Sequence, residues 1–388
     1  MTLTRWLEMS NEAINARQSP MSTLLPTLRP LSKVSPLTRS LRTCRHERRT
    51  YAISAGGAPI AEVFDSRAKY LHKERSARNV EQSRQVDYIR DEVAARLCDR
   101  LLDIKRHFPK VLDFGANACN IARVLTRPAP DLTGNEEGEV RDPGEPIAKR
   151  IGELICTDTS PAMLYRDENE PFNQEISVQR QVLQQAEYLP YEPESFDLVM
   201  SSMSLHWIND LPSVLTQFNN ILKPDAPFIA AMSGGDSLYE LRGSLQLAEQ
   251  ERLGGIGTHI SPLADVRDVG NLLSRAGFKL LTVDVDDIVV DYPNTLALMA
   301  DLQSMGEANA ALRREHGPLP RDVLLATEAI YRELYGEEQE DGSITIPATF
   351  RTIYMIGWKE SVNTPKPLER GTGQANLTDV LGDGGRIG

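Results

Sequence analysis

The sequence predicts an α/β fold in which helices cover a mostly parallel sheet. Two observations lead to this prediction. Short apolar segments typical of buried strands alternate with longer segments of helical periodicity. A glycine-containing turn, 115–118, joins one strand directly to the next helix, as in many ligand-binding α/β units. No apolar run approaches the roughly 18 residues of a membrane span, so we expect no transmembrane segment.

The first elements are a helix, a strand and a second helix. A helix is expected over 84–105 because its apolar residues recur at spacings of three and four and so share one face. Those residues are Val86, Ile89, Val93, Leu97 and Leu101. A short buried strand follows at 111–114, and the turn after it opens a helix that continues to about Leu125.

The later elements continue the alternation. Strands are expected at 153–157, 195–200, 228–232 and 352–358, and helices at 211–222, 237–253, 296–305 and 321–335. Two more strands, 280–283 and 288–290, are expected on either side of an acidic turn at 284–287. The charged stretch His72-Lys73-Glu74 is interpreted as a solvent-exposed face and not as a metal-binding pair. We therefore predict no metal site.

A charge asymmetry divides the sequence near residue 51. Of 388 residues, 43 are Lys or Arg and 55 are Asp or Glu, a formal net charge of −12. Residues 1–51 hold nine basic and three acidic residues, a charge of +6, which leaves −18 for the rest. An Arg- and Ser-rich, acid-poor start is typical of a mitochondrial transit peptide. We predict one over 1–51, and the acidic remainder argues against a globally basic nucleic-acid-binding protein.

Composition also sets the expected domain limits. The main domain is expected over 61–360. Proline, glycine and acidic residues dominate 127–148, which we interpret as a loop insertion. The Gly- and Pro-rich segment 361–388 is expected to be a flexible tail.

Two positions in this pattern have the chemistry of a ligand site. The turn at Gly115 allows backbone N–H groups to approach a ligand, with a helix N-terminus behind them. Asp158 ends the next strand, where a carboxylate can bind ribose hydroxyls. His206, beside Trp207 after a strand end, is the best-placed catalytic candidate, with a hydrogen-bonded structural histidine as the alternative.

Several motifs resemble known proteins. The segments similar to class I S-adenosylmethionine-dependent methyltransferases are 111–115, 189–191, 195–199 and 222–225. More specific blocks resemble the mitochondrial arginine hydroxylase family known as complex I assembly factor five. These blocks are 204–212, 234–242, 244–249, 259–262, 301–307 and 354–359. The likeness extends over roughly residues 61–372.

The resemblance implies a fold and a function. The fold would be a class I methyltransferase (Rossmann-like) domain with a seven-stranded, mostly parallel sheet and a helical cap from 236–275 and 295–336. The family hydroxylates an arginine in the iron–sulfur subunit that carries the terminal cluster of complex I, the NADH:ubiquinone oxidoreductase. It acts on the matrix side of the mitochondrial inner membrane as a peripheral protein, with a small twin-cysteine assembly factor as partner. No nucleic acid is expected.

The resemblance also implies site residues. S-adenosylmethionine would be bound by Asp113, Gly115, Asn117, Asp158 and Gln185. Tyr239 and Arg242, three residues apart on one helix face, would help to hold the substrate protein.

The cofactor loop departs from the family pattern. The second and third glycines of Asp-x-Gly-x-Gly-x-Gly are Asn117 and Cys119 here, and Gln185 replaces an acid that usually binds the adenine amino group. Asn tolerates left-handed backbone better than most residues, and Cys is small enough for a helix–strand contact. Two alternatives therefore stay open: an S-adenosylmethionine-dependent methyltransferase, and a non-catalytic assembly chaperone with a decayed cofactor loop.

Overall fold

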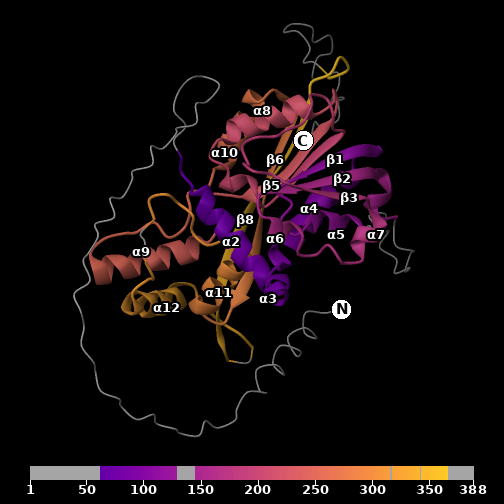
Figure 1. Ribbon diagram of the computed structural model, residues 1–388. Helices are drawn as coiled ribbons and strands as arrows, with labels where there is room; N and C mark the ends of the chain where they lie inside the picture. The colour runs from indigo at the N-terminus through magenta and orange to yellow at the C-terminus, as the bar shows by residue number, and fades with distance from the viewer. Residues whose placement is uncertain (1–61, 129–144, 315–316, 341, 366–388) are drawn as a thin grey trace, which may run out of the picture. The chain divides into compact units, whose positions relative to one another are not determined.

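The computed structural model describes residues 62–128, 145–314, 317–340 and 342–365 (Figure 1). The predicted transit peptide over 1–51 lies outside them, as do most of the insertion at 127–148 and most of the tail at 361–388. The predicted domain limits therefore stay predictions.

The sheet follows the order β3-β2-β1-β4-β5-β8-β6, and the short β7 pairs with β8. Its strands are β1 (Phe108–Phe114), β2 (Ile151–Asp158), β3 (Val178–Val182), β4 (Leu198–Ser202), β5 (Pro227–Ser233), β6 (Phe278–Tyr292), β7 (Glu337–Glu338) and β8 (Ile344–Lys359). The pairs among β1 to β5 are parallel, and β8 is antiparallel to both β5 and β6. This mostly parallel sheet confirms the predicted fold class.

Helices connect the strands and cover both faces. They are α2 (Ser66–Arg78), α3 (Val80–Gln85), α4 (Tyr88–Leu102), α5 (Asn120–Leu125), α6 (Pro161–Leu164), α7 (Phe172–Glu175), α8 (Leu211–Ile221), α9 (Tyr239–Leu253), α10 (Val266–Arg275), α11 (Thr295–Met305) and α12 (Arg321–Tyr335). Short 3-10 helices cover Ile147–Arg150 and Leu205–Trp207. No helix of the described residues is both long enough and apolar enough to cross a bilayer.

Two apolar cores lie on the two faces of the sheet. Because side chains alternate along a strand, Val111 packs into the core that includes α4 and α5, whereas Leu112 packs into the core that includes α8 and α10. Figure 1 shows these two pairs of helices on opposite sides of the strands. In open α/β sheets, ligands bind at the carboxyl ends of the parallel strands, so a site is expected there.

The predicted helix at 84–105 is two helices in the structure. The chain breaks at Val86 and Asp87, between α3 and α4. The apolar face from Ile89 to Leu101 is buried as predicted. The break turns Asp87 inward, where it accepts hydrogen bonds from Arg123 and Arg166. Periodicity located the buried face, but ion pairs with distant arginines set the start of the helix.

The predicted acidic turn at 284–287 is wrong. These residues belong to one long edge strand, β6, which pairs with β8 from end to end with one irregularity. Asp284 pairs with Arg100, Asp286 with Arg96, and Asp287 with Arg351. The sequence suggested a turn because it contains three acidic residues here. In the structure, arginines of α4 and β8 compensate these acids, so they can lie in a strand. Charges on an edge strand also oppose pairing with another chain.

The exposed face predicted around His72 is also wrong. Lys69 and Lys73, one turn apart on α2, are both buried. Glu74 accepts hydrogen bonds from the Ser160 hydroxyl and the Ala162 N–H. Polar groups beneath α2 form hydrogen bonds and ion pairs with these charged side chains. Composition does not show such partners, so the burial of this helix could not be predicted from it.

The helices of the predicted cap differ in what they contact. Helix α9 packs along α12, and α11 contacts α2, α3 and α12. Helix α10, from the same predicted segment as α9, packs against β6 and α8. Figure 1 shows α9, α11 and α12 away from the face that α8 and α10 cover.

Candidate functional site

The cofactor loop keeps a backbone suited to glycine at each of its three predicted glycine positions. Gly115 has a φ of +68°, and a Cβ there would lie 2.0 Å from the Ser204 hydroxyl oxygen. Asn117 and Cys119 also have left-handed backbone, with φ of 52° and 59°. The Asn117 side-chain amide donates to the Gly115 carbonyl at 3.0 Å, which helps to offset its backbone strain.

The carboxylate of Asp158 is covered and already has three donors. It accepts from Lys73 Nζ at 2.7 Å, from the Ser160 N–H at 2.9 Å and from the Asn117 N–H at 3.1 Å. Ala77 of α2 packs on Ala118 of the loop. Sequence reasoning missed Lys73, because nothing in a charged stretch shows that it folds over the loop.

The loop fits the chemistry of S-adenosylmethionine, but an ion pair within the chain already uses its carboxylate. A carboxylate at the end of β2 suits two ribose hydroxyls, and Asn117 Oδ1 is buried without a partner. However, Lys73 occupies the Asp158 carboxylate, and both residues are buried in the structure. Lys73 therefore competes with a ribose hydroxyl for the Asp158 carboxylate.

Two other predicted cofactor residues lie in different surroundings. Asp113 is fully buried, and burial together with the nearby Asp158 raises its pKa to about 8. Its Oδ1 has no hydrogen-bond partner. Gln185 is exposed on the segment after β3. The structure thus brings Asp113, Gly115, Asn117 and Asp158 together and leaves Gln185 at the surface.

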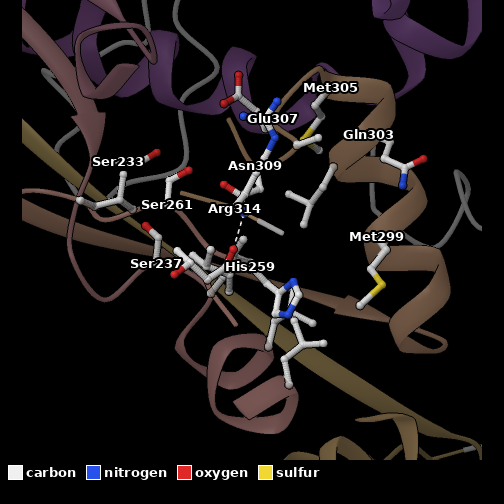
Figure 2. A pocket seen from close by; sticks show the side chains of 18 of the residues that line it. Ser233, Ser237, His259, Ser261, Met299, Gln303, Met305, Glu307, Asn309 and Arg314 are labelled. Atoms are coloured by element: carbon white, nitrogen blue, oxygen red, sulfur yellow. Dashed lines mark hydrogen bonds between the residues drawn. The ribbon is translucent and has the colours of Figure 1, made fainter. Parts of the chain in front are cut away.

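A cavity of about 660 Å³ lies beyond this loop, at the carboxyl ends of β4 and β5. Helices α9 and α11 and the segments that follow each of them form its walls. Met299 and Gln303 of α11 lie opposite Ser233 and Ser261 (Figure 2). Its size and its mixture of apolar and polar walls are typical of a small-molecule or side-chain site.

Glu307 is one of two carboxylates that line the cavity, and its side chain is partly buried. It accepts from Lys69 Nζ at 2.8 Å, from Arg90 Nη2 at 3.0 Å and from the Trp207 indole N–H at 2.7 Å. Burial opposes ionisation of Glu307, but Lys69, His206 and Arg90 outweigh it and hold its pKa well below the ordinary value. Burial lowers the pKa of Lys69 to about 7.

The predicted catalytic candidates His206 and Trp207 both line the cavity. His206 is buried, with Nε2 3.6 Å from Glu307 and Nδ1 without a partner. Burial lowers its pKa, although Glu307 opposes the shift. A neutral imidazole with one free nitrogen can donate or accept a proton toward the cavity. The catalytic assignment of these two residues stays a prediction.

The second carboxylate of the cavity is Glu249, near the end of α9. It accepts from the Gly257 N–H at 2.6 Å and is hydrogen-bonded to His259 Nε2. In the part of the chain that the structure describes, its ion pair is with His259, which is charged only when protonated. Ser261, in the same segment, is buried with an unpartnered hydroxyl.

The predicted substrate-holding residues lie outside the cavity lining. Tyr239 is exposed, with its ring edge-on to Tyr335. Arg242 donates to the Gly235 and Ser237 carbonyls. Asp236, just before this helix, pairs with Arg351, and Leu238 stands at the cap position with left-handed backbone. Their role in holding a substrate protein stays a prediction.

The sequence did contain a signal for the cavity that site reasoning overlooked. Glu249, His259 and Glu307 each lie in one of the specific blocks that carried the family resemblance. These blocks are far apart in the sequence, and the structure brings them to one cavity. The family blocks thus contained three of the residues that line the cavity.

Comparison with known proteins agrees with the topology. Residues 143–230 match the family described as Methyltransferase domain. Together with the strand order, this match defines a protein of the class I methyltransferase-like class. A malonyl-[acyl-carrier protein] O-methyltransferase of Halorhodospira halophila is 31% identical over 300 residues, covering 77% of this chain and 89% of that protein.

Closer relatives identify the family within this class. The mitochondrial arginine-hydroxylase NDUFAF5 of Danio rerio is 42% identical over 342 residues, covering 88% of this chain and 95% of that protein. The human protein of the same name is 44% identical over 318 residues, covering 82% and 83%. The chain belongs to the family of mitochondrial arginine-hydroxylase NDUFAF5, which confirms the predicted family.

Proposed function

We propose that this protein hydroxylates an arginine in the iron–sulfur subunit that carries the terminal cluster of complex I, and that it acts as a complex I assembly factor. The observation that carries this proposal is the cavity at the ends of β4 and β5, which is lined by two carboxylates, the buried Glu249 and the partly buried Glu307. A carboxylate-containing cavity suits a guanidinium-bearing side chain. The names of the relatives supply the reaction class. Replacing a C–H bond of arginine with C–OH removes two electrons, and the proposal assigns their acceptance to an external two-electron oxidant.

We further propose that the loop around Gly115 binds S-adenosylmethionine after Lys73 releases Asp158. The matched methyltransferase domain and the retained left-handed turn support this proposal. When bound, this group supplies an activated methyl group. Asp158 would accept the ribose hydroxyls, and Asn117 and Gln185 would lie beside the cofactor.

The setting proposed for the protein is the mitochondrial matrix, with peripheral attachment to the inner membrane through a protein partner. The mitochondrial relatives and the +6 charge of residues 1–51 support import. Cleavage near residue 51 would leave an acidic chain of charge −18, which favours a basic substrate surface. A small twin-cysteine assembly factor is the proposed anchor.

Mass spectrometry tests the reaction. The iron–sulfur subunit would be isolated from cells that lack this protein and from the same cells after its expression is restored. We expect the restored cells to add one oxygen to one arginine. A gain of one methyl group would instead assign a methyltransferase, and restored assembly with no mass change would assign a chaperone.

A further inference from the structure

The two carboxylates of the cavity differ in charge compensation. Glu307 has two cationic partners from the chain, Lys69 and Arg90, at 2.8 Å and 3.0 Å. Glu249 is only 2% exposed, yet its ion pair in the described residues is with His259. A histidine is charged only when it is protonated, so this pair does not give Glu249 the permanent cation that Arg90 gives Glu307. A buried carboxylate without a permanent cation is costly and favours a cationic ligand.

We infer that Glu249 binds the guanidinium group of the substrate arginine, with Ser261 as a second acceptor. The identity of this ligand rests on the proposed function. A guanidinium group is always charged, and its planar set of five N–H donors matches a carboxylate. Each carboxylate oxygen has two acceptor positions. Glu249 can therefore keep its bonds to Gly257 and His259 and still accept a guanidinium group.

The Ser261 hydroxyl is an independent observation that points to a ligand. It lines the cavity, lies on the segment that also carries His259, is 7% exposed, and has no hydrogen-bond partner. A buried hydroxyl without a partner is uncommon in folded proteins. Figure 2 shows Ser261 and His259 among the side chains around the cavity. An N–H group of a bound guanidinium would satisfy Ser261.

The cavity also has a surface for the aliphatic part of an arginine. Leu245 and Leu253 of α9, Leu302 of α11, and Leu319 contribute apolar walls. About 660 Å³ accommodates an arginine side chain together with its neighbouring backbone. Arg90 and Arg314 also line the cavity, but they pair with Glu307 and Asp65. Glu249 is therefore the cavity carboxylate that has no Lys or Arg partner among the described residues.

Calorimetric titration of the full chain tests the inference. The probes are a blocked Gly-Arg-Gly peptide and the same peptide with citrulline, which has nearly the same shape but no charge. We expect the arginine peptide to bind at least tenfold more tightly than the citrulline peptide. Glu249→Gln should weaken arginine binding at least tenfold and remove this discrimination, and Ser261→Ala should weaken it several-fold.

Glu251→Gln is the matched control, because Glu251 lies on the same helix with an exposed side chain. It should bind both peptides as the unmodified chain does. Thermal unfolding checks that each variant folds. If Glu249→Gln does not fold, Ser261→Ala and the preference of the unmodified chain for arginine decide the question.

Three results would overturn the inference. They are no binding of the arginine peptide at millimolar concentration, equal binding of both peptides, and unchanged binding by a folded Glu249→Gln variant. None of these depends on the reaction. Arginine binding without hydroxylation of the subunit would refute the proposed function alone. Full hydroxylation by Glu249→Gln would refute this inference alone.

Discussion

Two buried carboxylates, Asp158 and Glu249, lie in the two halves of the site and are compensated differently. Asp158 is paired with Lys73 at 2.7 Å, and α2 covers both groups. Glu249 faces a cavity, and its ionic partner is His259, which is charged only when protonated. In the loop around Gly115, the chain itself supplies a lysine cation for Asp158. In the cavity, Glu249 has no such lysine or arginine within the described part of the chain, so a ligand can supply the cation. An internal ion pair competes with a ligand, and an incompletely compensated charge attracts one.

The largest expected effect comes from breaking the compensated half. Asp158→Ala leaves Lys73 buried without its partner, and we expect the free energy of unfolding to fall by about 3–5 kcal/mol. Urea unfolding measures this loss. The double variant Asp158→Ala with Lys73→Met should recover the part due to the unpaired lysine, but not the bonds lost by the Ser160 and Asn117 N–H groups. Equal stability of the two variants would show that the ion pair is unimportant.

Removing the other partner tests whether Lys73 competes with the cofactor. Lys73→Met frees the Asp158 carboxylate for ribose hydroxyls. Since a hydrogen bond to a charged group is worth about 1.5–3 kcal/mol, S-adenosylmethionine should bind at least tenfold more tightly by calorimetry. Lys149→Met, at an exposed ion pair, is the control. An unchanged dissociation constant for Lys73→Met would mean that ribose does not use Asp158.

Asp113 predicts a pH dependence for the same half. Its pKa rises from 3.8 to about 8 on folding, mainly because of burial. The folded state therefore holds a proton that the unfolded state loses. Its contribution to stability is complete below about pH 4 and is lost as the pH rises toward 8, by at most about 1.4 kcal/mol per pH unit.

Asp113→Asn should flatten this dependence, because an amide does not titrate. Urea unfolding at about pH 5 and about pH 7.5 compares the two chains within that window. The difference in unfolding free energy between the two pH values should be smaller for Asp113→Asn. An identical difference in both chains would mean that Asp113 ionises with its ordinary pKa in the folded protein.

The smallest expected effect concerns the altered glycine position. Asn117→Gly relieves a left-handed backbone strain of about 1 kcal/mol but loses the bond to the Gly115 carbonyl and adds freedom to the unfolded chain. We expect the unfolding free energy to change by less than about 1 kcal/mol and S-adenosylmethionine to bind more tightly. A large loss of stability by thermal unfolding would show that the asparagine side chain holds the loop together.

The sequence predicted the sheet better than the site. Apolar strands such as β1 and β5 and the periodic face of α4 depend on local patterns, which a single sequence shows. Lys73 covers Asp158 although the two residues are 85 positions apart in the sequence. The pairing of His206 with Glu307 likewise joins residues 101 positions apart. Composition describes such charges only as polar, so their burial could not be predicted from it.

Helix α2 covers the loop with an unusual set of side chains, and this has a consequence for local opening. Its buried residues are two lysines, one serine and two alanines. Detachment of α2 would therefore hydrate charged groups and expose little hydrocarbon. Heat capacity rises mainly when apolar surface meets water. Opening of the loop should accordingly show a small heat-capacity change beside that of global unfolding, and amide hydrogen exchange of α2 measured over temperature would reveal it.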